Sequence, residues 1–190
     1  MAGGHDAVEQ RFRLLFERQW RRVRAYTLRR TSNPAAADDV VAEVFLIAWR
    51  RVGDVPEDNE LAWLLGVARR VLSNAHRGDA RRDRLLARLH EATPRAVPQD
   101  DMAGVIEADE AAANIGEALR RLRPADAEIL QLAAWEQLGH AQIAIVLECS
   151  VNAVAIRLHR ARQKLAEELA KGWANSGDIS ADPHRTAEEP

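Results

Sequence analysis

The sequence predicts an all-α protein of two small helical domains joined by a flexible linker, the C-terminal domain containing a helix-turn-helix. Three observations lead to this fold class. Apolar residues recur at helical spacing along most of the 190 residues, and no alternating strand pattern is present. Residues 93–103 interrupt that spacing with two prolines and two aspartates. Residues 139–165 have the lengths of a short helix, a tight turn and a longer helix.

The first half of the chain carries three apolar stripes. The first covers residues 8–26, and Ser32-Asn33-Pro34 separates it from the second, at residues 40–49. Pro34 is well placed to open the second helix, because the first helical position needs no backbone N–H. Residues 52–60 hold a glycine, a proline and four acidic residues, which predicts a loop before the third stripe at residues 64–72.

The end of the first domain and the organisation of the second are predicted in the same way. We expect Gly78 to end the third helix and residues 85–89 to form a short further helix. Pro124 separates stripes at residues 115–122 and 129–138. The expected organisation is a domain over 7–92, a flexible linker over 93–107, a domain over 108–171 and a polar tail over 172–190.

The composition is that of a soluble globular protein, with 47% hydrophobic and 29% charged residues. The single cysteine, Cys149, excludes a disulfide framework. No apolar run approaches the roughly 20 residues that span a bilayer. The N-terminus lacks the basic start and apolar stretch of a secretory signal. We therefore expect a cytoplasmic protein without a membrane span.

Charge is distributed unevenly along the chain. The formal net charge of −2 argues against a free-standing nucleic-acid binder. Residues 1–92, however, carry 17 arginines against 13 acidic residues, and the remainder of the chain is acidic on balance. A basic first half is compatible with a local DNA-binding face.

Catalytic and metal-binding constellations are not evident in the sequence. The six histidines lack metal-ligand spacing, and Cys149 has no second cysteine with which to form a zinc site. No glycine-rich loop that could hold a phosphate group is present. The sequence predicts neither an enzyme nor a bound metal or cofactor.

The strongest local signal is the helix-turn-helix pattern. Ser150 is a natural N-cap for the second helix, and Gly139 with Gln142 forms a weakened capping box for the first. On a helical wheel, Val154, Leu158 and Leu165 share the apolar face of the second helix. The residues available to a DNA groove are Asn152, Ala153, Ile156, Arg157, His159, Arg160 and Arg162. The same pattern would also suit a solvated face of a bundle helix.

Three segments of the chain resemble extracytoplasmic-function sigma factors, the small two-domain initiation factors of bacterial RNA polymerase. Their C-terminal helix-turn-helix domain is similar to the stretch EILQLAAWEQLGHAQIAIVLECSVNAVAIRLHRARQKL. Their core-binding helix resembles NPAAADDVVAEVFLIAWRR, and their promoter-melting helix resembles AWLLGVARRVLSNAHRGDARR. The segments occur in the family's order, with a linker where the family has one.

The resemblance implies an alternative sigma factor that binds core RNA polymerase and directs promoter-specific transcription initiation. Its implied partners are core polymerase, promoter DNA and a cognate anti-sigma factor, which is common in the family. Asp38, Asp39 and Glu43 would dock on the basic coiled coil of the polymerase clamp. Ala42 departs from the family, where a glutamine is usual.

The resemblance also assigns two DNA-binding surfaces. The minus-ten element would be opened and bound by Asn59, Trp63, Arg69, Arg70, Ser73, Asn74 and Arg77. Trp63 could stack on a flipped base or could equally be a core aromatic. The last helix would read the minus-thirty-five element through the groove-facing residues named above. Glu148 stands where glycine is common, and Ala155-Ile156 replaces the usual basic-serine pair.

Two alternative functions belong to other classes. A stand-alone helix-turn-helix regulator would need neither the basic third helix nor the acidic second helix. The other alternative is a helical protein-interaction module, such as a regulator that sequesters a partner.

Overall fold

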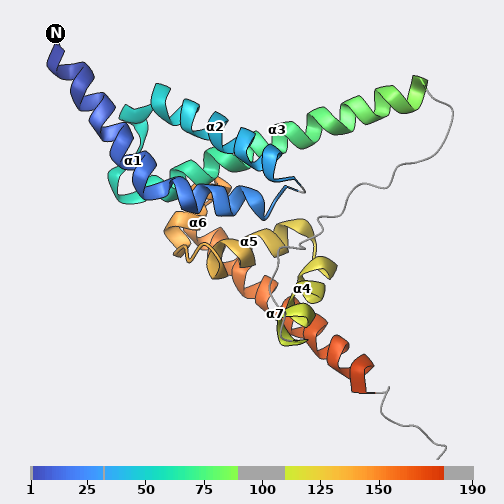
Figure 1. Ribbon diagram of the computed structural model, residues 1–190. Helices are drawn as coiled ribbons and strands as arrows, with labels where there is room; N and C mark the ends of the chain where they lie inside the picture. Colours follow the sequence, from blue (N-terminus) through green and yellow to red (C-terminus); the bar gives the residue numbers. More distant parts are fainter. Residues whose placement is uncertain (1, 32, 90–109, 178–190) are drawn as a thin grey trace, which may run out of the picture.

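The computed structural model describes residues 2–31, 33–89 and 110–177, and all the regular secondary structure in these residues is helical (Figure 1). The N-terminal half contains α1 (Ala2–Leu28), α2 (Pro34–Arg50), η1 (Val52–Asp54), η2 (Glu57–Asn59) and α3 (Glu60–Leu89). The C-terminal half contains α4 (Glu110–Arg121), α5 (Pro124–Ala134), α6 (His140–Leu147) and α7 (Val151–Gly177). The all-α prediction is confirmed, and the predicted linker lies outside the described residues.

The N-terminal half is a bundle in which α1, α2 and α3 contact one another. Val23, Val44 and Leu64 are fully buried between them. As predicted, α2 begins at Pro34; the side chain of Asn33 accepts a hydrogen bond of 2.8 Å from the Ala35 N–H. This cap fixes the direction in which α2 leaves the end of α1.

The C-terminal half is arranged around α7, which contacts α4, α5 and α6. Val154, Leu158 and Ala161 form its buried face. The Nζ atom of Lys164 donates a hydrogen bond of 2.6 Å to Asp126 near the start of α5. The Lys164 ammonium holds the pKa of the Asp126 carboxyl below its ordinary value, with a smaller contribution from Arg123. The first half of α7 is therefore held against the rest of the domain.

Two helix boundaries differ from the sequence prediction. The predicted break at Gly78 is wrong, because α3 continues to Leu89 without interruption and extends beyond the other helices (Figure 1). One glycine costs a helix only about 1 kcal/mol, which the good helix formers around it can offset. Likewise, α7 continues past Gly172 to Gly177, into the segment expected to be a polar tail.

The two halves pack against each other through α3 and α6. A Cβ atom added to the buried Gly66 would lie 3.7 Å from the Ile145 carbonyl oxygen and 3.7 Å from the Val146 Cα atom. The backbones of the two helices therefore approach closely at this point. One hydrophobic core runs through both halves, including Leu65 and Val146. We call this contact the inter-domain seam, and include in it the ion pairs Arg29–Glu136, Arg69–Glu128 and Arg70–Glu148.

No single helix among the described residues is long and apolar enough to cross a membrane. The bent pair of α6 with Val151–Lys171 reaches the required length and composition only when its two helices are counted together.

Candidate nucleic-acid interface

The helix-turn-helix is formed by α6, the turn Glu148-Cys149-Ser150 and α7. The Ser150 hydroxyl accepts a hydrogen bond of 3.2 Å from the Ala153 N–H, so the predicted N-cap is present. The Gln142 side chain accepts one of 3.0 Å from the Gly139 N–H, which is the half of a capping box that a glycine permits. These local bonds set where α7 begins and therefore which residues face outward.

Glu148 has the conformation that its position in the turn requires, at φ 53° and ψ 48°. This left-handed region is unfavourable for a residue with a Cβ atom, by roughly 1–2 kcal/mol. The turn follows the expected course although glutamate replaces the usual glycine.

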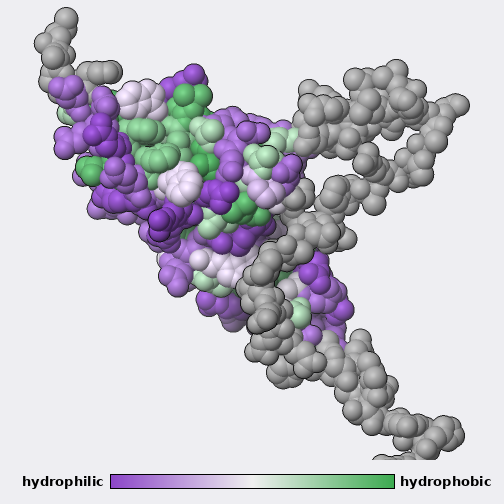
Figure 2. Space-filling model, in the orientation of Figure 1, coloured by the Kyte–Doolittle hydropathy of each residue, from purple (hydrophilic) through white to green (hydrophobic). Residues whose placement is uncertain are grey.

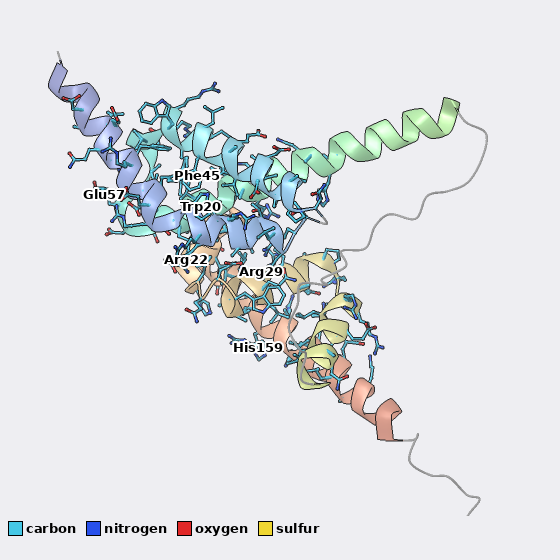
Figure 3. The ribbon with its side chains drawn as sticks, viewed as in Figure 1. Trp20, Arg22, Arg29, Phe45, Glu57 and His159 are labelled. Carbon is cyan, nitrogen blue, oxygen red and sulfur yellow. The ribbon has the colours of Figure 1, made fainter. Side chains whose placement is uncertain are left out.

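The predicted recognition residues lie on the side of α7 opposite the core. Ala153 and Arg157 are half-buried at the edges of this face; its exposed members are Asn152, Ile156, His159, Arg160 and Arg162. Figure 3 shows His159 projecting from α7. None of the three arginines forms an ion pair with another described residue. Their guanidinium groups can therefore reach phosphates or base edges.

The predicted minus-ten residues on α3 have two different environments. Ser73, Asn74 and Arg77 are exposed, and Arg77 donates a hydrogen bond of 2.6 Å to Asn74. Arg69 and Arg70 instead pair with glutamates of the C-terminal half. The Nε atom of Arg69 lies 2.8 Å from the Glu128 Oε1 atom, and Arg70 pairs with Glu148. The hydrogen bond to Glu128 raises the pKa of Arg69 above its ordinary value.

Two further predicted minus-ten residues lie at the start of α3, Asn59 at the end of η2 and Trp63 in the first turn of α3 itself. Asn59 lines a cavity of about 210 Å³, together with Gln137 and Gln142 of the C-terminal half. Trp63 is half-buried against the core, and the Arg51 guanidinium lies 5.8 Å from the centre of its ring. One face of Trp63 thus packs against the core. Its predicted roles as a surface on which a flipped base stacks and as a core aromatic both remain open.

The acidic residues of α2 also differ in their surroundings. Asp38 pairs with Arg24 of α1 at 2.7 Å, and this bond raises the pKa of Arg24 above its ordinary value. Asp39 and Glu43 are exposed one turn apart and have no ion-pair partner among the described residues. Leu46, one turn further along, is 48% exposed. Asp39, Glu43 and Leu46 therefore form one outward stripe.

The sequence reasoning missed the residues of the inter-domain seam. Glu136 is only 3% exposed, and its carboxylate lies 2.6 Å from Arg29 and 3.7 Å from Arg30. Arg22 donates a hydrogen bond of 2.8 Å to the Glu136 carbonyl oxygen. Arg22 and Arg29 lie where the end of α1 meets the C-terminal half (Figure 3). A buried carboxylate so far along the chain from its partners has no signal in a periodicity pattern.

Comparisons with known families agree with the two-part architecture. The family model described as Sigma-70 region 2 matches residues 15–82, and that of Sigma-70, region 4 matches residues 112–165. RNA polymerase sigma factor CarQ of Myxococcus xanthus is 28% identical over 167 residues, covering 87% of this chain and 93% of CarQ. ECF RNA polymerase sigma factor SigL of Mycobacterium tuberculosis is 27% identical over 168 residues, covering 87% of this chain and 92% of SigL.

The chain belongs to the extracytoplasmic-function sigma factors. As an alternative sigma factor it binds core RNA polymerase and promoter DNA and directs transcription initiation. Region 2 comprises most of α1 to α3, and region 4 contains the helix-turn-helix. A stand-alone helix-turn-helix regulator would account for region 4 alone, and an interaction module for neither region.

Solved structures support the fold of this sigma factor. RpoE of Bartonella quintana, determined with the anti-sigma factor NepR, has a TM-score of 0.50 and 18% identity, covering 90% of this chain and 98% of RpoE. CnrH, determined with the cytosolic domain of CnrY, has a TM-score of 0.54 and 25% identity, covering 84% of this chain and 88% of CnrH. Within the described residues of our sigma factor, no group of three histidine, cysteine or acidic residues could hold a metal ion.

Proposed function

We propose that this sigma factor uses three separate surfaces, one for core polymerase, one for the minus-ten element and one for the minus-thirty-five element. The observation that carries the proposal is the two-sided character of α7. Val154 and Leu158 are buried, whereas Asn152, Ile156 and Arg160 on the opposite side are exposed. The corresponding functional domains are residues 7–92 and 108–171, joined by 93–107.

The polymerase surface is the outward stripe of α2. Asp39 and Glu43 supply negative charge for a basic partner, and charge complementarity of this kind favours rapid and specific association. Leu46 lies within about 60° of them on the helical wheel and supplies apolar contact beside the charges. Asp38, which pairs with Arg24, contributes mainly by holding α2 to α1.

Apolar side chains also gather around this surface. Figure 2 shows hydrophobic side chains over α1 and α2. Phe16 and Trp20 are more than one-third exposed, and the ring centres of Phe16 and Phe45 lie 4.8 Å apart. An exposed apolar area beside an acidic stripe is typical of a protein-binding surface. It is available to core polymerase, and in competition with it to an anti-sigma factor, the kind of partner found with the RpoE and CnrH structures.

The minus-ten surface comprises the η2 turn and the exposed side of α3. A flipped base must be held by a pocket and by backbone contacts, since unstacking costs a few kcal/mol. Asn59 and Trp63 would contact such a base. Arg69, Arg70 and Arg77 offer positive charge to the strand, with Ser73 and Asn74 as polar neighbours. The acidic residues around Asn59 disfavour phosphate contact at the loop itself.

The minus-thirty-five surface reads bases through the outward side of α7. Arg160 can pair with a guanine, and Asn152 can bond a base edge. Ile156 and Ala153 offer apolar contact to thymine methyl groups. Arg157 and Arg162 lie at the flanks and favour phosphates, and His159 stands beside Arg160 on the exposed side.

The protein acts in the cytoplasm and has no catalytic activity of its own.

The test is transcription reconstituted from purified core polymerase, this protein and a promoter library. Specific start sites that depend on the added protein support the proposal. Ala substitutions in each surface should then fail at different steps: core binding for Asp39 and Glu43, strand opening for Asn59, and upstream-element selection for Arg160. DNA binding without polymerase-dependent starts would contradict it.

A further inference from the structure

One ion pair joins the recognition helix α7 to the start of α5. The Nζ atom of Lys164 donates a hydrogen bond of 2.6 Å to the Oδ2 atom of Asp126, and the Nε atom of Arg123 donates one of 3.0 Å to the same oxygen. The Asp126 side chain is only 11% exposed, and the positive end of the α5 dipole favours its negative charge. Charge-assisted bonds of this kind are stronger than neutral ones, so they constrain the two helices that they connect.

Lys164 lies on the same side of α7 as two of the predicted DNA-contacting residues. At about 100° per residue, Lys164 is about 40° from Arg160, one turn before it, and about 20° from Arg157. Any rotation of α7 about its own axis that moves Arg160 therefore also moves Lys164. The bond to Asp126 opposes such a rotation.

The recognition residues lie between two polar anchors of α7. At the start of the helix, the Ser150 hydroxyl accepts its hydrogen bond from the Ala153 N–H. This cap is made within the turn, so it fixes where α7 begins but not how the helix is rotated against α5. Within the part of the chain that the structure describes, Lys164 is the only residue of α7 that forms an ion pair with another helix. The apolar contacts of α7 are less directional, because burial depends on area and not on angle.

The size of the effect follows from the geometry of a helix. The outer part of a helical side chain lies about 5–6 Å from the axis, so a rotation of about 10° displaces it by about 1 Å. A binding constellation needs its groups held within about 0.5 Å of the productive position. A guanidinium group that bonds both acceptors of a guanine is directional, whereas phosphate contacts carry no sequence information. A small rotation of α7 would therefore impair base reading by Arg160 before it weakens phosphate binding.

We infer that Asp126, which lies outside the helix-turn-helix, is a positioning residue for promoter recognition. Through Lys164 it sets the rotation of α7 in the major groove, and so determines how the Arg160 guanidinium meets a base edge. Arg123 holds the Asp126 carboxylate from the same helix. This role of Asp126 rests on the proposed base reading by Arg160, and it makes the specificity of α7 depend on a residue of α5.

Two variants break the pair from opposite sides. Asp126→Asn removes the negative charge, keeps the size of the side chain and leaves the charge of Lys164 in place. Lys164→Met removes the ammonium group and keeps a side chain of similar length. The matched control is Lys171→Met, because Lys171 pairs at 2.7 Å with Glu168 of the same helix and so cannot hold α7 against α5. Circular dichroism at the assay temperature checks that each variant keeps its helix content.

The measurement is initiation by holoenzyme, formed from core polymerase and the full chain, on promoters randomised across the upstream element. Arg160→Ala identifies the base position that this arginine reads, where we expect the wild type to prefer one base by about tenfold. Asp126→Asn and Lys164→Met should each reduce that preference to about threefold or less, and the double variant should lose no more than either single one. Lys171→Met should keep the preference. The salt slope of promoter binding should be the same for Asp126→Asn and wild type, since the arginines of α7 keep their phosphate contacts.

The contrary outcomes separate Asp126 from Arg160. An equal loss of initiation on all promoters would show that Asp126 only stabilises the domain, and would overturn the inference. An unchanged base preference in Asp126→Asn and Lys164→Met, alongside a lost preference in Arg160→Ala, would also overturn it and leave the proposed function intact. If Arg160→Ala itself changes no base preference, base reading by Arg160 fails, and the positioning role of Asp126 fails with it.

Discussion

Replacing Glu148 by glycine measures what the helix-turn-helix turn costs in this protein. Glu148 lies at φ 53° and ψ 48°, where a Cβ atom costs roughly 1–2 kcal/mol and glycine avoids that cost. Its carboxylate pairs with Arg70 across the seam, and both side chains are at least half exposed. Such a pair contributes about 0–1 kcal/mol. Glu148→Gly therefore removes the cost of the left-handed conformation and loses a weak ion pair.

The matched control is Glu148→Ala, which loses the same ion pair but keeps a Cβ atom in the left-handed conformation. The difference between the two variants isolates the backbone cost. We expect the free energy of unfolding to be about 1 kcal/mol higher for Glu148→Gly than for Glu148→Ala. For a protein of this size that is a difference of roughly 2–4 °C in Tm, which thermal unfolding followed by circular dichroism resolves.

One outcome of comparing Glu148→Gly with Glu148→Ala would contradict this prediction. If Glu148→Ala is as stable as Glu148→Gly, or more stable, then residue 148 does not hold a left-handed conformation in solution. The direction in which α7 leaves the turn would then differ from the one described, and the set of outward-facing recognition residues would have to be redrawn.

Three other predictions concern the recognition side of α7, the acidic stripe of α2 and the pairing of Lys164 with Asp126. Arg160→Ala should weaken initiation at one upstream base position, at roughly 1–3 kcal/mol of discrimination, whereas Arg162→Ala should weaken all promoters alike and lower the salt slope by about 1. Equal, sequence-blind losses in promoters randomised across that element would contradict this difference. Asp39→Arg with Glu43→Arg should abolish core-polymerase binding in a pull-down with little change in Tm, because both side chains are exposed; an unfolded double variant would mean that the carboxylates are structural. Because Lys164 lowers the pKa of Asp126 in the folded state, its stabilising effect is lost as the pH falls from about 4 toward that lower value. Asp126→Asn should therefore flatten the acid side of a plot of Tm against pH, and an unchanged slope would contradict the assignment.

Much of the fold is determined by short stretches of sequence, because helices are stabilised by contacts three and four residues apart. The apolar stripe of α7, the start of α2 at Pro34 and the cap at Ser150 are local features, and each was predicted. The outward side of α7 follows from the same periodicity. The break expected at Gly78 was wrong because one glycine is a weak signal whose cost the surrounding helix can offset.

The tertiary structure alone decided how the two halves meet. Arg69 and Glu128 are 59 residues apart, and Arg29 and Glu136 are 107 apart. No periodicity connects residues at such separations, since the pairing depends on how the two halves pack against each other. By sequence, Glu136 is one of many charged residues, yet it is the carboxylate that the fold buries between the halves. The recognition residues could be predicted from α7 alone, whereas the glutamates opposite the minus-ten arginines became apparent only when the helices were packed together.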